Sequence, residues 1–71
     1  MSTKRDVERD ISPAAFAALL RRVADAVEQG QSFRIQVANQ RFTVPAGAAA
    51  SVEHELDDGS HELELQLKWS D

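Results

Sequence analysis

The last stretch of the sequence, residues 61–69, alternates strictly between polar and apolar side chains. It reads HELELQLKW, so the leucines and the closing Trp69 fall on every second position. Successive side chains of a strand point to opposite faces, which gives this segment one apolar and one charged face. A helix, with its step of about 100° per residue, would scatter the same leucines around its axis. The pattern predicts a terminal strand whose apolar face the rest of the chain must cover.

Composition limits how that cover can be built. The chain has 71 residues, so we expect a single domain over residues 1–71 that buries only about 60% of its unfolded surface. Without cysteine, neither disulfides nor thiolate metal sites can stabilise it. A net charge of −4 argues against nucleic acid or an anionic membrane as partner. With no signal peptide or membrane span in the sequence, we expect a cytoplasmic domain.

One amphipathic helix is predicted to supply the cover. Ser12 can cap its first turn, Pro13 suits the first helical position, and Gly30 can end it in a left-handed conformation. Apolar residues then recur at steps of three and four: Phe16, Leu19, Leu20, Val23, Ala24 and Val27. Residues 1–10 are charged and predict either a solvated tail or a short edge strand through residues 5–8.

Two hairpins follow the helix in the sequence. Residues 32–44 alternate on both sides of a turn at 38–41, and Pro45 opens a connecting loop. Residues 51–56 form the next strand, and Asp58-Gly59 is a strong signal for a two-residue turn into the terminal strand. That turn places Val52 opposite Leu65. We therefore predict an α+β fold with the helix packed on one face of a four-stranded antiparallel meander.

The chain as a whole resembles the amphi-Trp domains, a family of small bacterial and archaeal domains named for an amphipathic segment that ends in Trp. The resemblance covers nearly all of the sequence and rests on five pieces: Val7-Glu8, residues 19–27 before Gly30, Val44-Pro45, residues 53–55 and residues 62–69. It implies a compact α+β domain with no assigned activity and no known catalytic residues.

Four glutamates fall on the polar face of the last hairpin. The register sets Glu53 opposite Glu64 and Glu55 opposite Glu62, and like charges in these positions destabilise a sheet unless something compensates. In a sequential meander Arg41 would approach Glu53 or Glu55. The face is either a solvated surface, an acidic docking site for a basic protein, or a weak binding site for a divalent cation. Trp69 is either a lid on the core or a binding anchor.

The two histidines, His54 and His61, are predicted to lie near each other on the apolar face. They can supply half of a metal site, but no third ligand is evident on that face, and histidines at the rim of a core are commonly structural. We therefore expect no metal and no cofactor.

No enzyme signature stands out. The three glycines are assigned to a helix end, a loop and a hairpin, and no serine lies in a nucleophile-elbow sequence. We expect a non-enzymatic interaction domain that acts through the acidic face or an open strand edge, with strand pairing into a homodimer as one outcome. The alternative is a small-ligand or metal-binding protein that uses His54, His61 and nearby carboxylates.

Overall fold

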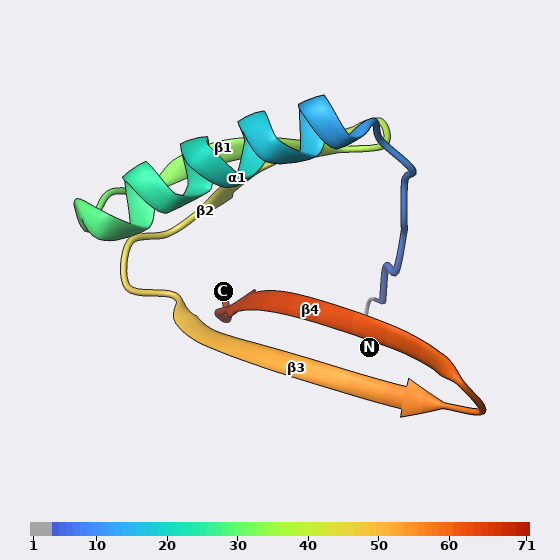
Figure 1. Ribbon diagram of the computed structural model, residues 1–71. Helices are drawn as coiled ribbons and strands as arrows, with labels where there is room; N and C mark the ends of the chain where they lie inside the picture. Colours follow the sequence, from blue (N-terminus) through green and yellow to red (C-terminus); the bar gives the residue numbers. More distant parts are fainter. Residues whose placement is uncertain (1–3) are drawn as a thin grey trace.

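The computed structural model describes residues 4–71, which form one helix and four strands (Figure 1). In chain order the elements are α1 (Pro13–Glu28), β1 (Phe33–Val37), β2 (Gln40–Val44), β3 (Ala49–Asp57) and β4 (Ser60–Lys68). Both strand pairings are antiparallel, so the predicted α+β class and the number of strands are confirmed. Within the described range, no helix is both long and apolar enough to cross a membrane.

Both ends of α1 have the caps that the sequence predicts. The Ser12 hydroxyl accepts a hydrogen bond of 3.1 Å from the N–H of Ala15, and Pro13 is the first helical residue. At the other end Gly30 has a φ of 66°, and the N–H groups of Gly30 and Gln31 bond back into the last turn at 3.1 and 2.9 Å. This pair of bonds is a Schellman motif, so local sequence alone sets the length of the helix.

The four strands form two separate hairpins rather than one sheet. Among the described residues β1 pairs with β2 and β3 pairs with β4, but β2 and β3 do not pair. The predicted four-stranded meander is therefore wrong at the step from β2 to β3. Pro45 has no N–H for a ladder, and Gly47 turns the loop with a φ of 82°, so the chain leaves the first hairpin before it enters the second.

The turn of the second hairpin and its register are confirmed. Asp58 and Gly59 have φ values of 53° and 83°, as a type I′ turn requires. Each predicted pair is present, including Val52 with Leu65, and the ladder runs further than expected, from Asp57–Ser60 back to Ala49–Lys68. Because the side-chain period of a strand is two, this register fixes which residues share a face.

The first hairpin has a shorter turn than expected. Val37 pairs with Gln40, so the turn contains only Ala38 and Asn39, and Gln40 and Arg41 already belong to β2. The positive φ of 56° lies at Ala38. In two-residue hairpin turns a positive φ at the first position is the place for glycine, so Ala38 is strained.

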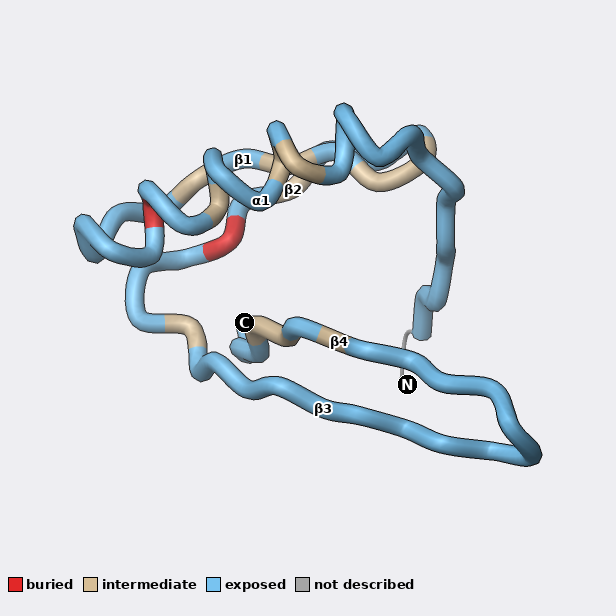
Figure 2. The backbone as a smooth tube through the Cα atoms, viewed as in Figure 1, coloured by how far each residue is buried: buried red, intermediate tan, exposed pale blue. Residues whose placement is uncertain are grey.

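Helix α1 packs on the β1–β2 hairpin, its neighbour in the sequence. Ala26 of the helix and Val44 of β2 are the two buried residues of the described range (Figure 2). The side chains around them, including Leu19 and Val23, are half-buried. The Arg22 guanidinium also donates a hydrogen bond of 2.7 Å to the main-chain oxygen of Arg34 in β1. A small core thus lies between the helix and the first hairpin.

The predicted cover of the terminal strand by the helix is wrong over most of its length. Leu63 remains 74% exposed and Leu65 58% exposed, and Phe16 of the helix is 54% exposed. Among the described residues, the helix and the first hairpin approach the β3–β4 hairpin near the chain end, where Leu67 is half-buried and lines a cavity of about 170 Å³ together with Val27. Part of the apolar stripe of α1 packs on the adjacent β1–β2 hairpin, and that part cannot also cover β3–β4.

The segment before the helix contains neither helix nor strand over residues 4–12. It runs from the start of α1 toward the β3–β4 hairpin (Figure 1). Arg5 ties it to the first hairpin, since its guanidinium donates a hydrogen bond of 3.0 Å to the Val37 carbonyl. The edge strand suggested for residues 5–8 is therefore not formed, and residues 1–3 of the suggested tail lie outside the described range.

Replacement of Ala38 by glycine is expected to stabilise the protein. A side chain in the left-handed region costs about 1–2 kcal/mol, and glycine's greater freedom in the unfolded chain returns about 0.4–1 kcal/mol of this. We expect a net gain of about 0.5–1 kcal/mol in the free energy of unfolding, measured by urea titration. Ala18→Gly, at an exposed position in the interior of α1, is the matched control and should lose about 1 kcal/mol. An Ala38→Gly variant less stable than the wild type would contradict this account of the turn.

Candidate interaction surface on the β3–β4 hairpin

One face of the β3–β4 hairpin is acidic. We use the term acidic face for Glu53, Glu55, Glu62 and Glu64, which the register places as two directly facing pairs, Glu53–Glu64 and Glu55–Glu62. Glu53, Glu55 and Glu62 are exposed, and Glu64 is half-buried. The predicted juxtaposition of like charges is therefore present, and it calls for a compensating group.

Gln66 is that group for the first pair. Its amide nitrogen lies 3.0 Å from a carboxylate oxygen of Glu64 and 3.5 Å from one of Glu53, and donates to both. Its amide oxygen accepts a hydrogen bond of 3.2 Å from the Ser51 hydroxyl, directly across the ladder. Sequence reasoning overlooked this residue, although the signal was there: Gln66 is the polar-face neighbour of Glu64 and the register partner of Ser51.

Within residues 4–71, no side chain donates in this way to both members of the second pair, Glu55 and Glu62, which lies nearer the turn. Oxygens of Glu55, Glu62 and Glu64 lie within 4.8 Å of one another. The pKa of the Glu62 carboxyl is raised above its ordinary value of 4.5, first because of its hydrogen bond with Glu64 and then because the charges of Glu55 and Glu64 oppose its ionisation. Crowded negative charge is thus concentrated at this end of the acidic face.

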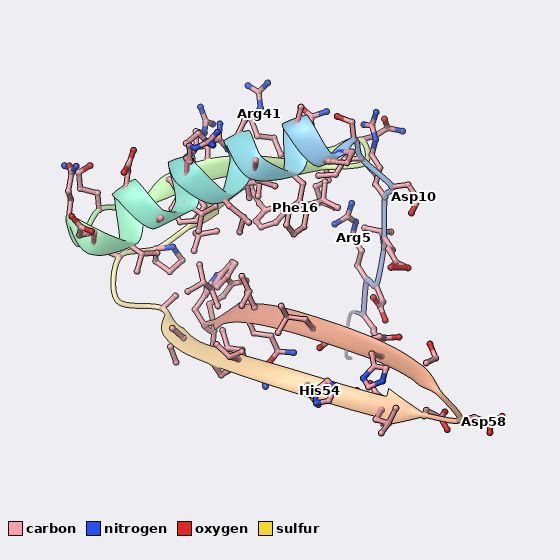
Figure 3. The ribbon with its side chains drawn as sticks, in the orientation of Figure 1. Arg5, Asp10, Phe16, Arg41, His54 and Asp58 are labelled. Carbon is pink, nitrogen blue, oxygen red and sulfur yellow. The ribbon has the colours of Figure 1, made fainter. Side chains whose placement is uncertain are left out.

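Arg41 does not join the acidic face. It lies in β2, which forms no ladder with β3, so the condition that would have brought it near Glu53 or Glu55 is not met. Figure 3 shows Arg41 projecting away from the β3–β4 hairpin, on the far side of α1. The acidic face therefore keeps its charge, and the guanidinium belongs to another surface of the molecule.

Trp69 lies between the two parts of the structure. Its ring centroid is 6.2 Å from that of Phe42 in β2, with an angle of 28° between the ring planes, which is an offset-stacked arrangement. It nevertheless remains 40% exposed. Trp69 thus contacts the first hairpin as a lid would, while part of the residue stays accessible.

The two histidines meet on the opposite face of the hairpin. Nε2 of His54 lies 2.9 Å from Nδ1 of His61, and the ring centroids are 5.2 Å apart in planes only 7° from parallel. The two nitrogens thus point at one another along the line between the rings, and one donates its proton to the other. The predicted proximity of the histidines is present (Figure 3 labels His54).

The histidines and the glutamates cannot act on one ion together. His54 pairs with Leu63 and His61 with Leu56, so both rings share a face with the leucines. The cluster of Glu55, Glu62 and Glu64 lies on the other face, because neighbouring residues of a strand point in opposite directions. A site that combines His54 and His61 with these carboxylates is therefore excluded by the register.

The chain matches a known protein family. The Amphi-Trp domain matches residues 2–71, which is nearly the whole chain. This protein belongs to the Amphi-Trp domain family. The resemblance seen in the sequence is thereby confirmed, and the activity of the domain stays unassigned. No curated protein and no solved structure matches the chain.

In this Amphi-Trp domain the raised pKa of Glu62 predicts a pH dependence of stability. A carboxyl whose pKa is higher in the folded state binds its proton more tightly there. Its stabilising contribution is complete below pH 4.5 and is lost as the pH rises through the folded-state pKa. Glu62→Gln, which stays neutral, should therefore raise the urea midpoint at pH 7 and have no such effect below about pH 4.

Carbon NMR of the Glu62 carboxyl measures the same effect directly and should give a pKa above 4.5. Asp71→Asn is the control, because it removes one negative charge outside the acidic face and should leave the midpoint unchanged. A Glu62→Gln variant that is no more stable than the wild type at pH 7 would show that the charges on this face do not repel appreciably.

Proposed function

We propose that this Amphi-Trp domain is a non-enzymatic protein-interaction module whose working surface is the β3–β4 hairpin. The observation that carries the proposal is the exposure of the hairpin: every residue of β3 is exposed, over nine residues. Strands that serve only as scaffold are normally half-buried, because one face packs on a core. An element that is regular, long and uncovered is available to another molecule.

The charge of the hairpin supports a basic partner. The acidic face presents four carboxylates, and Asp57 and Asp58 extend the negative charge around the turn. Complementary charge speeds encounter between proteins and excludes partners of the wrong sign. After the hydrogen bond with Glu64, repulsion from the charges of Glu55 and Glu64 also raises the pKa of Glu62, and a cationic side chain docked between Glu55 and Glu62 would relieve that repulsion.

The open strand edges offer a second mode of contact. Each described strand pairs on one side only, so β3 and β4 each present an edge with free main-chain donors and acceptors. Such edges accept an added strand from another chain, including a second copy, in which case the main chain gives affinity and the side chains give specificity.

We propose a cytoplasmic setting on composition alone, since a chain without cysteine suits a reducing compartment.

The test is affinity capture from an extract of the source cells with two versions of the domain. A variant with Glu53, Glu55, Glu62 and Glu64 all replaced by lysine should recover the partner at least about tenfold less well at low salt, and wild-type recovery should fall as salt rises. The control carries the same change in charge elsewhere, with Asp6, Asp10, Glu28 and Asp71 replaced by lysine. Circular dichroism checks that both remain folded.

Recovery of the same proteins by the wild type and the acidic-face variant would mean that the acidic face is only a solvated surface. Loss of recovery in both variants would mean that net charge matters rather than this face. Either result removes the proposed working surface.

A second candidate function, metal binding, is favoured by the 2.9 Å approach of the two histidine nitrogens. Two imidazoles on one hairpin face supply two ligands, whereas a zinc site ordinarily needs at least three from the protein. The bonded nitrogens also face each other, so a metal would have to displace the shared proton. We therefore rank this function below protein interaction.

Titration with zinc separates the two functions. Under the interaction proposal, the ring signals of His54 and His61 in a proton NMR spectrum should not move at one equivalent of zinc. A shift that saturates at one equivalent, and that His54→Gln abolishes, would favour metal binding instead.

A further inference from the structure

Two apolar surfaces of the same chain are left open. On α1 we call Phe16, Leu20 and Val27 the helix stripe, and their exposed fractions are 54%, 38% and 47%. On the β3–β4 hairpin we call Val52, Leu56, Leu63 and Leu65 the leucine face, with exposed fractions from 58% to 74%. Monomeric proteins rarely leave contiguous apolar surface of this kind in water. Figure 3 shows Phe16 projecting from the helix toward the side on which the hairpin lies.

The accessible surface area of the chain is larger than that expected for a folded monomer of the same mass. A folded monomer of 7.8 kDa is expected to expose about 4,400 Å², whereas this chain exposes 6409 Å². Its radius of gyration is 13.7 Å, against about 11 Å for a compact domain of this length. The excess of about 2,000 Å² has not been buried within the chain.

We infer that a second copy of this chain covers these surfaces. The leucine face of each copy lies on the helix stripe of the other, in a reciprocal dimer related by a two-fold axis. The contacts of Leu67 and Trp69 with the first hairpin remain within each chain and hold the root of the β3–β4 hairpin in place.

A second copy fits better than an unrelated partner for two reasons. Each chain carries both halves of the contact, and their lengths are similar: α1 spans about 24 Å and β4 about 30 Å. The area allows such a dimer, since an excess of about 2,000 Å² on each of two chains sets an upper bound of about 4,000 Å² in total. Obligate dimers bury roughly 2,000–5,000 Å², so burial of about half of this excess is enough.

This inference goes beyond the proposed function and does not depend on it. The acidic face lies on the opposite side of the hairpin from the leucine face, so a dimer closed by the leucines leaves the carboxylates outside. It also differs from pairing of strand edges, which would leave both apolar surfaces open.

The mass and shape of the protein in solution give the first test. Light scattering at micromolar concentration should give twice the 7.8 kDa of one chain. A monomer at every concentration would overturn the inference. A radius of gyration near 11 Å for that monomer would mean that the hairpin closes on its own helix.

Variants of the leucine face give the second test. Leu63→Glu combined with Leu65→Glu should raise the dissociation constant of the dimer at least about 100-fold, because two apolar contacts are lost and two charges would be buried. Both side chains are largely exposed in the single chain, so the helix content should survive. Glu53→Gln combined with Glu55→Gln, on the other face of the hairpin, is the control and should leave the dimer intact. A dimer that survives the leucine changes would overturn the inference.

Cross-linking tests the arrangement, since the sequence contains no cysteine of its own. Leu20→Cys protein mixed with Leu65→Cys protein should give a disulfide-linked heterodimer on oxidation, whereas either protein alone should give much less. Efficient linking of Leu65→Cys chains to one another would instead place leucine face on leucine face and overturn the reciprocal packing.

Discussion

A two-stranded hairpin has no interior, and this constraint governs the whole molecule. Its apolar face can be covered only by another element, and the chain provides a single described helix to cover two such faces. The helix lies on the hairpin that follows it directly, where Ala26 and Val44 become buried. The second hairpin then keeps contact only at its root, through Leu67 and through Trp69 on Phe42.

The polar face of the second hairpin shows how a small sheet tolerates like charge. Around Glu53 and Glu64 the amide of Gln66 donates to both carboxylates, so their repulsion is partly offset. Around Glu55 and Glu62 the charge is offset less well, and the pKa of Glu62 is raised, first by its hydrogen bond with Glu64 and then by the charges of Glu55 and Glu64. Exposure to water makes this arrangement tolerable, because solvent screens charges that a low-dielectric interior would not.

Under the two proposals, the opposite faces of the β3–β4 hairpin have separate roles. The acidic face suits a cationic surface, while the leucine face suits the apolar stripe that each copy of the chain carries on its own helix. The two contacts lie on opposite sides of one strand pair, so one does not obstruct the other. In such an arrangement dimerisation would complete the fold, and the acidic face would remain free to bind a partner.

The sequence by itself determined the local structure of this protein. The Ser12 cap and the Gly30 stop set the helix, and Asp58-Gly59 set the turn and thereby the register of every pair from Val52–Leu65 to Leu56–His61. The acidic face followed from that register. These features depend on neighbours within a few residues, or on a single tight turn, so the pattern of residues is enough to predict them.

Only the tertiary structure decided how the elements pack. The alternating pattern that predicts β3 and β4 is equally compatible with one sheet and with two, because it states which face is apolar and not what covers that face. The loop after Pro45 separated the hairpins, which moved Arg41 away from the glutamates and left Leu63 and Leu65 exposed. The free energy gained by burying an apolar face depends on the buried area rather than on which element buries it. The sequence pattern therefore could not predict which element packs on that face.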